Sequence, residues 1–132
     1  MAYHFKRSRP QTAGLKLEMI GHFLLEGSES LHSITSHYSN QELVVFIERD
    51  IDHHNAANLR REIDSEIARY RPAKVILNFD AVEFMDSSGI GLIMGRYKYM
   101  QETGGELKVA ALSPRCQKLV DISGITKIVK TV

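Results

Sequence analysis

The sequence has little of what marks secreted, membrane-spanning or nucleic-acid-binding proteins. Its single cysteine cannot form an internal disulfide, which favours a reducing compartment. No apolar run approaches the length of a membrane span, and the first residues lack the apolar stretch and cleavage site of a secretory signal. A net charge of +1 gives no broad basic surface for nucleic acid. These absences predict a cytoplasmic protein without membrane or nucleic-acid partners.

What is present fits one folded domain and an irregular beginning. The chain has 132 residues, of which 43% are hydrophobic and 25% charged, enough for one core. Residues 1–30 show no sustained period and are predicted to be an N-terminal extension, whereas residues 31–132 are predicted to be the domain. Within the extension, Leu15–Leu25 either forms one short amphipathic helix or is only loosely attached.

Apolar periodicity predicts strands alternating with helices after an opening hairpin. The expected strands are Ile34–Tyr38, Leu43–Ile47, Val75–Phe79, Leu107–Leu112 and a short one at Ile128-Val129. The expected helices begin at Asp52, Ser88 and Pro114; the first ends before Pro72 and the second reaches Glu102. This order predicts an α/β sandwich in which right-handed crossovers join the parallel strands.

A hydroxyl-bearing turn between a buried strand and the next helix is the main candidate site. It reads Asp86-Ser87-Ser88-Gly89. Most such strings only cap a helix, because Asp and Ser oxygens accept from unpaired backbone N–H groups. A serine here is also a surface hydroxyl that a kinase can modify, and helix N–H groups favour the resulting anion. Local chemistry does not choose between Ser87 and Ser88.

Asp52, which follows another strand, has two interpretations. It is either the N-cap of the first helix or part of a binding surface. Parallel sheets gather their sites at the carboxyl ends of the strands, so the second interpretation places Asp52 near Ser87.

These motifs together resemble a known family. Asp86-Ser87-Ser88-Gly89 with Gly95-Arg96-Tyr97-Lys98, and Asp52-His53-His54 upstream, closely resembles the anti-sigma factor antagonists of the STAS domain family. The likeness is closest to the sporulation members that control sigma-F, and it covers roughly Ile34 to Thr131. It implies a small mixed β-sheet, opened by a hairpin, with helices packed mainly on one face.

The resemblance also implies a function. Such a protein binds an anti-sigma factor with serine-kinase activity, releases the sigma factor, and is switched off by phosphorylation on serine; a phosphoserine phosphatase resets it. The phosphorylated serine of the family follows the aspartate, which corresponds to Ser87. Asp52, Asp86, Ser88 and Gly89 are then the expected partner-binding residues. No cofactor is implied, since the nucleotide belongs to the kinase. The alternative is a general stress or signalling STAS module with another kinase.

A Ser-dependent hydrolase is the alternative from another class. Ser87, one of His53 and His54, and one of Asp52 and Asp86 supply the residue types of a catalytic triad. The nucleophile motif Gly-x-Ser-x-Gly is absent, however. A metal site on the adjacent histidines is disfavoured because neighbouring side chains point apart. The expectation is a binding protein that is not an enzyme and holds no metal.

The helix after Ser87 carries two further features. Arg96 and Lys98 are expected to lie mainly on a solvated face, and the alternative is a binding strip that flanks a docked partner. Gly91 and Gly95, four residues apart, form a strip of small residues that either faces a partner or packs on the sheet.

Two features depart from the family pattern. Arg49-Asp50 stands where a glycine is expected before an acidic residue, which changes the local turn and charge. The chain stops at Thr131-Val132, where family members usually continue into a closing helix, so an exposed apolar flank is expected unless Leu15–Leu25 covers it.

Overall fold

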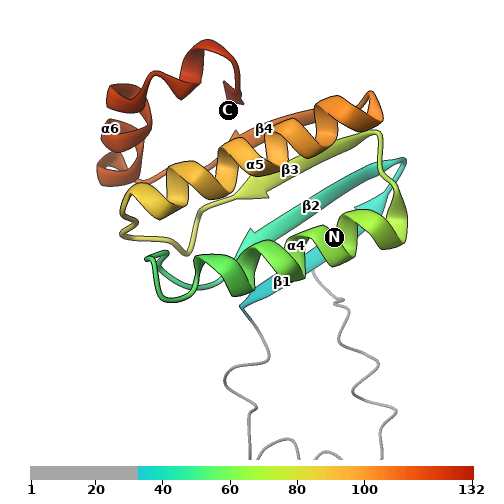
Figure 1. Cartoon of the computed structure of the whole chain (residues 1–132), viewed down its shortest axis with the longest axis horizontal. Coiled ribbons are helices and arrows are strands. Elements are labelled where there is room, and N and C mark those ends of the chain that lie inside the picture. Colours follow the sequence, from blue (N-terminus) through green and yellow to red (C-terminus); the bar gives the residue numbers. More distant parts are fainter. Residues whose placement is uncertain (1–32) are drawn as a thin grey trace, which may run out of the picture.

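The structure is a computed structural model that describes residues 33–132; the predicted extension, including Leu15–Leu25, lies outside the described residues. Strands and helices alternate through this part of the chain (Figure 1). In order they are β1 (Ile34–Ser39), β2 (Glu42–Ile47), α4 (Ala56–Tyr70), β3 (Lys74–Asn78), α5 (Ser87–Thr103), β4 (Glu106–Ala110), α6 (Pro114–Ser123), the 3₁₀-helix η2 (Ile125–Lys127) and β5 (Lys130–Thr131).

The strands form one mixed sheet in the order β1-β2-β3-β4-β5. β1 and β2 are antiparallel, and the remaining neighbours are parallel. Asn40 and Gln41 join the first two strands with φ of 50° and 65°, the left-handed geometry that matches the twist of a two-residue hairpin. The predicted opening hairpin is therefore confirmed.

Helices α4 and α5 cover one face of the sheet (Figure 1). Strand residues that point to this face are fully buried, among them Leu43, Val45, Val75 and Leu77, whereas the residues between them are only partly buried. Such alternation is typical of strands with one covered face. The predicted α/β fold, with helices mainly on one face of a small mixed sheet, is confirmed.

The two helices are joined by an ion pair that the sequence did not predict. Arg96 of α5 is only 6% exposed, and its Nε lies 2.7 Å from Oδ1 of Asp64 on α4. Burial lowers the pKa of Arg96 and raises the pKa of Asp64, so desolvation of both charges exceeds their mutual attraction. The expectation that Arg96 is mainly solvated was wrong, because the side of α5 that faces α4 includes this position; Lys98 is exposed, as expected.

Several predicted boundaries also differ; the fourth strand, for example, ends at Ala110 rather than Leu112. The first helix begins at Ala56 rather than Asp52, because residues 53–55 form a turn. The last strand is Lys130–Thr131 rather than Ile128-Val129. Val129 is buried, but its N–H bonds to the Ile125 carbonyl and so continues the η2 turn instead of joining the sheet. The apolar pair Ile128-Val129 correctly indicated a buried side chain, but a residue in a turn can be buried as fully as one in a strand.

The end of the chain carries exposed apolar side chains. Ile122, Ile128 and Val132 are 76%, 49% and 67% exposed.

None of the helices in residues 33–132 has both the length and the apolar character that a membrane span requires.

Candidate functional site

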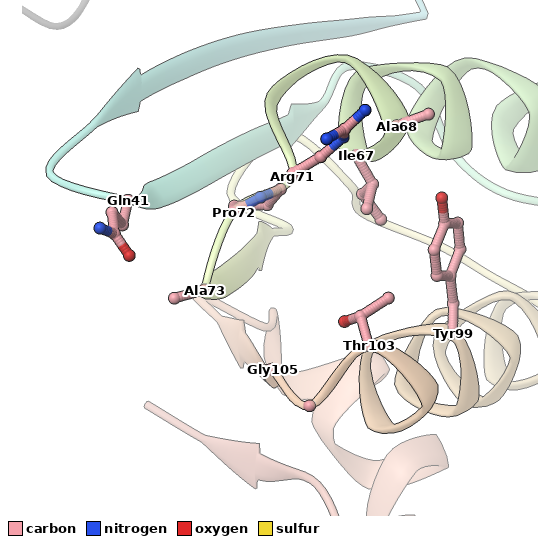
Figure 2. Close-up of a pocket in the computed structure, with 10 residues that line it drawn as sticks. Gln41, Ile67, Ala68, Arg71, Pro72, Ala73, Tyr99, Thr103 and Gly105 are labelled. Atoms are coloured by element: carbon pink, nitrogen blue, oxygen red, sulfur yellow. The ribbon is translucent and has the colours of Figure 1, made fainter.

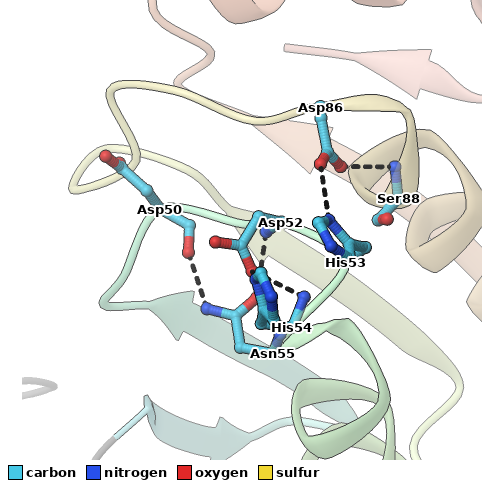
Figure 3. Close-up of polar contacts among 7 residues, drawn as sticks. All are labelled: Asp50, Asp52, His53, His54, Asn55, Asp86 and Ser88. Carbon is cyan, nitrogen blue, oxygen red and sulfur yellow. Dashed lines mark hydrogen bonds and ion pairs between the residues drawn. The ribbon is translucent and has the colours of Figure 1, made fainter.

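The candidate site is built from two loops joined at the carboxyl end of the sheet. Ile51, after β2, pairs in parallel with Met85, before α5. The Ile51 N–H donates to the Phe84 carbonyl at 3.1 Å, and the Asp86 N–H donates to the Ile51 carbonyl at 3.1 Å. Because this bridge aligns the two loops, Asp52 and Asp86 follow it side by side (Figure 3). The proximity of Asp52 to the start of α5, which the sequence predicted, is confirmed.

Asp50 holds the same two loops together through its side chain. Its Oδ1 accepts hydrogen bonds from the Glu83 N–H at 2.8 Å and the Phe84 N–H at 3.1 Å. In the sequence, Asp50 was only a departure from the family pattern. The N–H groups that donate to Asp50 belong to residues more than thirty positions away in the sequence, so no local pattern could have identified this role.

Asp52 organises the turn that precedes α4. Its Oδ1 accepts from the His54 N–H at 2.8 Å and the Asn55 N–H at 3.1 Å. Asn55 completes the turn, accepting from the Asp52 N–H and donating to the Asp50 carbonyl (Figure 3). The helix N-cap is Asn55, so the interpretation of Asp52 as the N-cap was wrong by one turn. The Asp52 side chain remains 46% exposed and accessible to a partner.

Asp86 is the N-cap of α5. Its Oδ1 accepts from the Ser88 N–H at 2.7 Å, and its Oδ2 lies 3.8 Å from Nδ1 of His53 (Figure 3). The Ser88 N–H lowers the pKa of Asp86, with smaller contributions from the Ser88 hydroxyl and from His53. The carboxylate is therefore ionised at neutral pH while its side chain stays 35% exposed.

The two serines differ in accessibility. Ser87 is the first residue of α5 and is exposed. Ser88 is half-buried, and both its N–H and its hydroxyl interact with Asp86. Ser87 is therefore the more accessible of the two serines, a difference that local sequence chemistry did not give.

Glycines of the same helix have opposite surroundings. Gly89 is buried, and a Cβ placed on it would lie 2.5 Å from Sδ of Met85. It thus supports the site by close packing rather than by offering a surface. A Cβ on Gly91 or Gly95 would meet nothing within 4 Å, so this strip does not pack on the sheet in the described structure.

The chemistry of this arrangement is that of a charged surface. Three carboxylates, from Asp50, Asp52 and Asp86, lie on the two joined loops with the exposed His53 and His54, whose rings are 4.0 Å apart. Among residues 33–132 no three His, Cys, Asp or Glu side chains gather as a metal site would require.

A hollow of about 640 Å³ lies elsewhere, at the opposite end of the sheet. Figure 2 shows it between the ends of α4 and α5, with Ile67 and Tyr99 on its helical side and Pro72, Ala73 and Gly105 near the strand starts. None of the predicted site residues lines it.

The chain is similar to proteins that regulate sigma factors. It is 38% identical over 86 residues to the anti-sigma F factor antagonist of Paenibacillus polymyxa, covering 65% of this chain and 74% of that one. It is 31% identical over 91 residues to the anti-sigma-B factor antagonist of Bacillus subtilis, covering 69% and 82%.

Solved structures of such antagonists have a similar fold. The anti-sigma factor antagonist SpoIIAA in its unphosphorylated form superposes with a TM-score of 0.64 at 26% identity, covering 75% of this chain and 87% of that one. The phosphorylated form of the Bacillus protein gives 0.58 at 26% identity, covering 75% and 90%. The model of the STAS domain matches residues 33–132. The chain therefore belongs to the STAS domain family.

Proposed function

We propose that this protein is an anti-sigma factor antagonist that is controlled by phosphorylation of Ser87. In this proposal it binds an anti-sigma factor with serine-kinase activity and so releases the sigma factor. The kinase then modifies Ser87, the complex weakens, and a phosphoserine phosphatase restores the active form. The names of the relatives support the antagonist role, and the similarity to SpoIIAA in its phosphorylated form supports control by phosphorylation.

The observation that carries the proposal is the position of Ser87. Its hydroxyl is exposed at the first position of a 17-residue helix, directly after the ionised Asp86 and next to the loop that holds Asp52. Asp86 and Ser88 flank Ser87 in the sequence and Asp52 follows the adjoining bridge. In this proposal the three form the docking surface, and buried Gly89 supports them.

The same position explains how one phosphate could weaken docking. Phosphoserine adds a charge of about −1.5 to −2. The helix N–H groups would favour this anion, but Asp86 already accepts from the Ser88 N–H. Repulsion from two neighbouring carboxylates, desolvated when a partner docks, then opposes binding. About 3–4 kcal/mol of such repulsion weakens a complex by roughly two to three orders of magnitude.

Mass spectrometry tests this proposal. The protein is incubated with ATP and the anti-sigma F factor of Paenibacillus polymyxa as the candidate kinase, and peptides are mapped in the wild type, Ser87→Ala and Ser88→Ala. We expect one phosphate on Ser87 in the wild type and in Ser88→Ala, and none in Ser87→Ala. Phosphate on Ser88 would contradict the proposal for that kinase. So would the absence of phosphate from this protein when the same kinase modifies its own antagonist in a control reaction.

A second candidate is a stress-response antagonist with a different kinase, which the similarity to the anti-sigma-B factor antagonist favours. Repeating the reaction with an anti-sigma-B factor kinase separates the two, because only the matching kinase should form a stable complex.

Replacing both His53 and His54 with alanine separates either binding role from a hydrolase. A hydrolytic triad would lose its general base, whereas a phosphate acceptor would still be modified.

A further inference from the structure

Phe84 is a large aromatic side chain left exposed beside the candidate site. It is 43% exposed, and the other large exposed apolar residues of the described chain are Ile122, Ile128 and Val132, near its end. Phe84 precedes buried Met85 by one residue and Ser87 by three. A single exposed apolar residue is common on protein surfaces, so the case for Phe84 rests on its position beside the candidate site and on what fixes and surrounds it.

The backbone of Phe84 is fixed on both sides. Its N–H donates to Asp50 Oδ1 at 3.1 Å, and its carbonyl accepts from the Ile51 N–H at 3.1 Å. The ring therefore projects from a loop that is already ordered. Binding through such a residue loses little conformational entropy, since few torsions remain to be restricted.

A cation lies near the ring. Cζ of Arg115, in the first turn of α6, is 5.9 Å from the centre of the Phe84 ring. The exposed guanidinium extends the surface toward α6, whereas Asp50, Asp52 and Asp86 supply negative charge from the two joined loops. Aromatic residues and arginine are both enriched at protein interfaces, and arginine is also enriched among the residues that carry most of the binding energy.

We propose that Phe84 is the apolar anchor of the docking surface: its ring enters a nonpolar pocket of the anti-sigma factor kinase, and Arg115 contacts an acidic group at the rim of that pocket. This inference rests on the proposed function and identifies the part of the surface that gives affinity in both phosphorylation states. In this proposal the burial of the Phe84 ring supplies affinity for the partner. The carboxylates and the phosphate on Ser87 then lower that affinity by electrostatic repulsion.

The test measures the dissociation constant of the kinase complex with ADP in place of ATP, so that Ser87 stays unmodified. The variants are Phe84→Ala, Phe84→Leu and Arg115→Ala. We expect Phe84→Ala to weaken binding at least tenfold and Phe84→Leu to weaken it less, because leucine retains an apolar side chain. Arg115→Ala should have a smaller effect, about threefold, since rim charges contribute little.

Ile122→Ala is the matched control, because Ile122 is more exposed than Phe84 and lies on the helix that carries Arg115. It should bind like the wild type, and thermal melts should show that every variant is folded. If the wild type binds and Phe84→Ala has the same dissociation constant, the role of Phe84 as an anchor is overturned, but the proposed function is not. Failure of the wild type to bind either kinase would overturn the proposed function and the anchor with it.

Discussion

The two ends of the sheet are built in different ways. At the carboxyl end, side chains hold the loops: Asp50, Asp52 and Asp86 each accept backbone N–H groups. At the opposite end, left-handed backbone conformations end the helices. Arg71 and Gly104 end α4 and α5 in the left-handed conformation, with φ of 48° and 84°.

The difference follows in part from helix polarity, because Asp86 caps α5, whereas Asp50 and Asp52 accept from N–H groups of loops and turns. Helix N-termini present unpaired N–H groups, which carboxylates satisfy, whereas helix C-termini present carbonyl groups, which a left-handed residue satisfies through its own N–H. The carboxyl end therefore collects acidic side chains at its surface, and the opposite end keeps a hollow lined largely by small and apolar residues. The proposed control by a phosphate belongs to the first of these ends, where the acidic side chains lie.

The largest effect should follow phosphorylation at the carboxyl end. We expect the phosphorylated protein to bind the anti-sigma factor kinase about 100- to 1,000-fold more weakly than the unmodified protein. Ser87→Asp should reproduce part of this loss, because one negative charge replaces nearly two. Isothermal titration calorimetry measures both. Ser65→Asp places the same charge on the exposed side of α4 and should bind normally; an equal loss there would show that net charge, not position, matters.

The opposite end should be the least tolerant of added bulk. A Cβ on Gly105 would lie 2.8 Å from the Ala73 carbonyl oxygen, which also accepts from the Glu106 N–H. That oxygen cannot move without loss of a sheet hydrogen bond, so Gly105→Ala should destabilise the protein by about 2–3 kcal/mol. Urea unfolding measures the change. A loss below about 0.5 kcal/mol would mean that this end relaxes more easily than its backbone contacts indicate.

At the carboxyl end the same substitution should cost less. A Cβ on Gly89 would press on the Met85 side chain, whose thioether can partly move aside, so Gly89→Ala should lose about 1 kcal/mol. Gly91→Ala is the matched control on the same helix. It meets open space and should gain about 0.5–1 kcal/mol from higher helix propensity. Equal effects at the two positions would contradict the packing described for Gly89.

The smallest effect should be a pH dependence at Asp86. Its folded pKa is lowered below the ordinary value of 3.8, so its ionisation favours the folded state. This contribution is present above pH 3.8 and is lost as the pH falls through the lower, folded pKa. Asp86→Asn keeps an oxygen that can cap α5 but does not titrate. Its urea midpoint should therefore fall less steeply than that of the wild type below pH 4; parallel curves would contradict the assignment.

The sequence by itself determined the order of strands and helices, because each depends on neighbours within a few residues. Asp86 caps the start of α5, as the sequence allowed, and α6 begins at the predicted Pro114. The helix predicted to end before Pro72 is present as α4, and its Leu59, Ile63 and Ile67 are buried. The rule that parallel strands gather sites at their carboxyl ends was sufficient to place Asp52 beside the start of α5.

Only the tertiary structure decided how the residues of the site differ. The hydrogen bonds of Asp50 join residues 33 and 34 positions apart, and the Arg96–Asp64 ion pair joins two helices. Neither leaves a local pattern. The exposure of Phe84 and the contrast between Gly89 and Gly91 likewise depend on which groups another segment places nearby. Local spacing sets which face of an element is apolar, but burial and charge at one position are set by what packs against it.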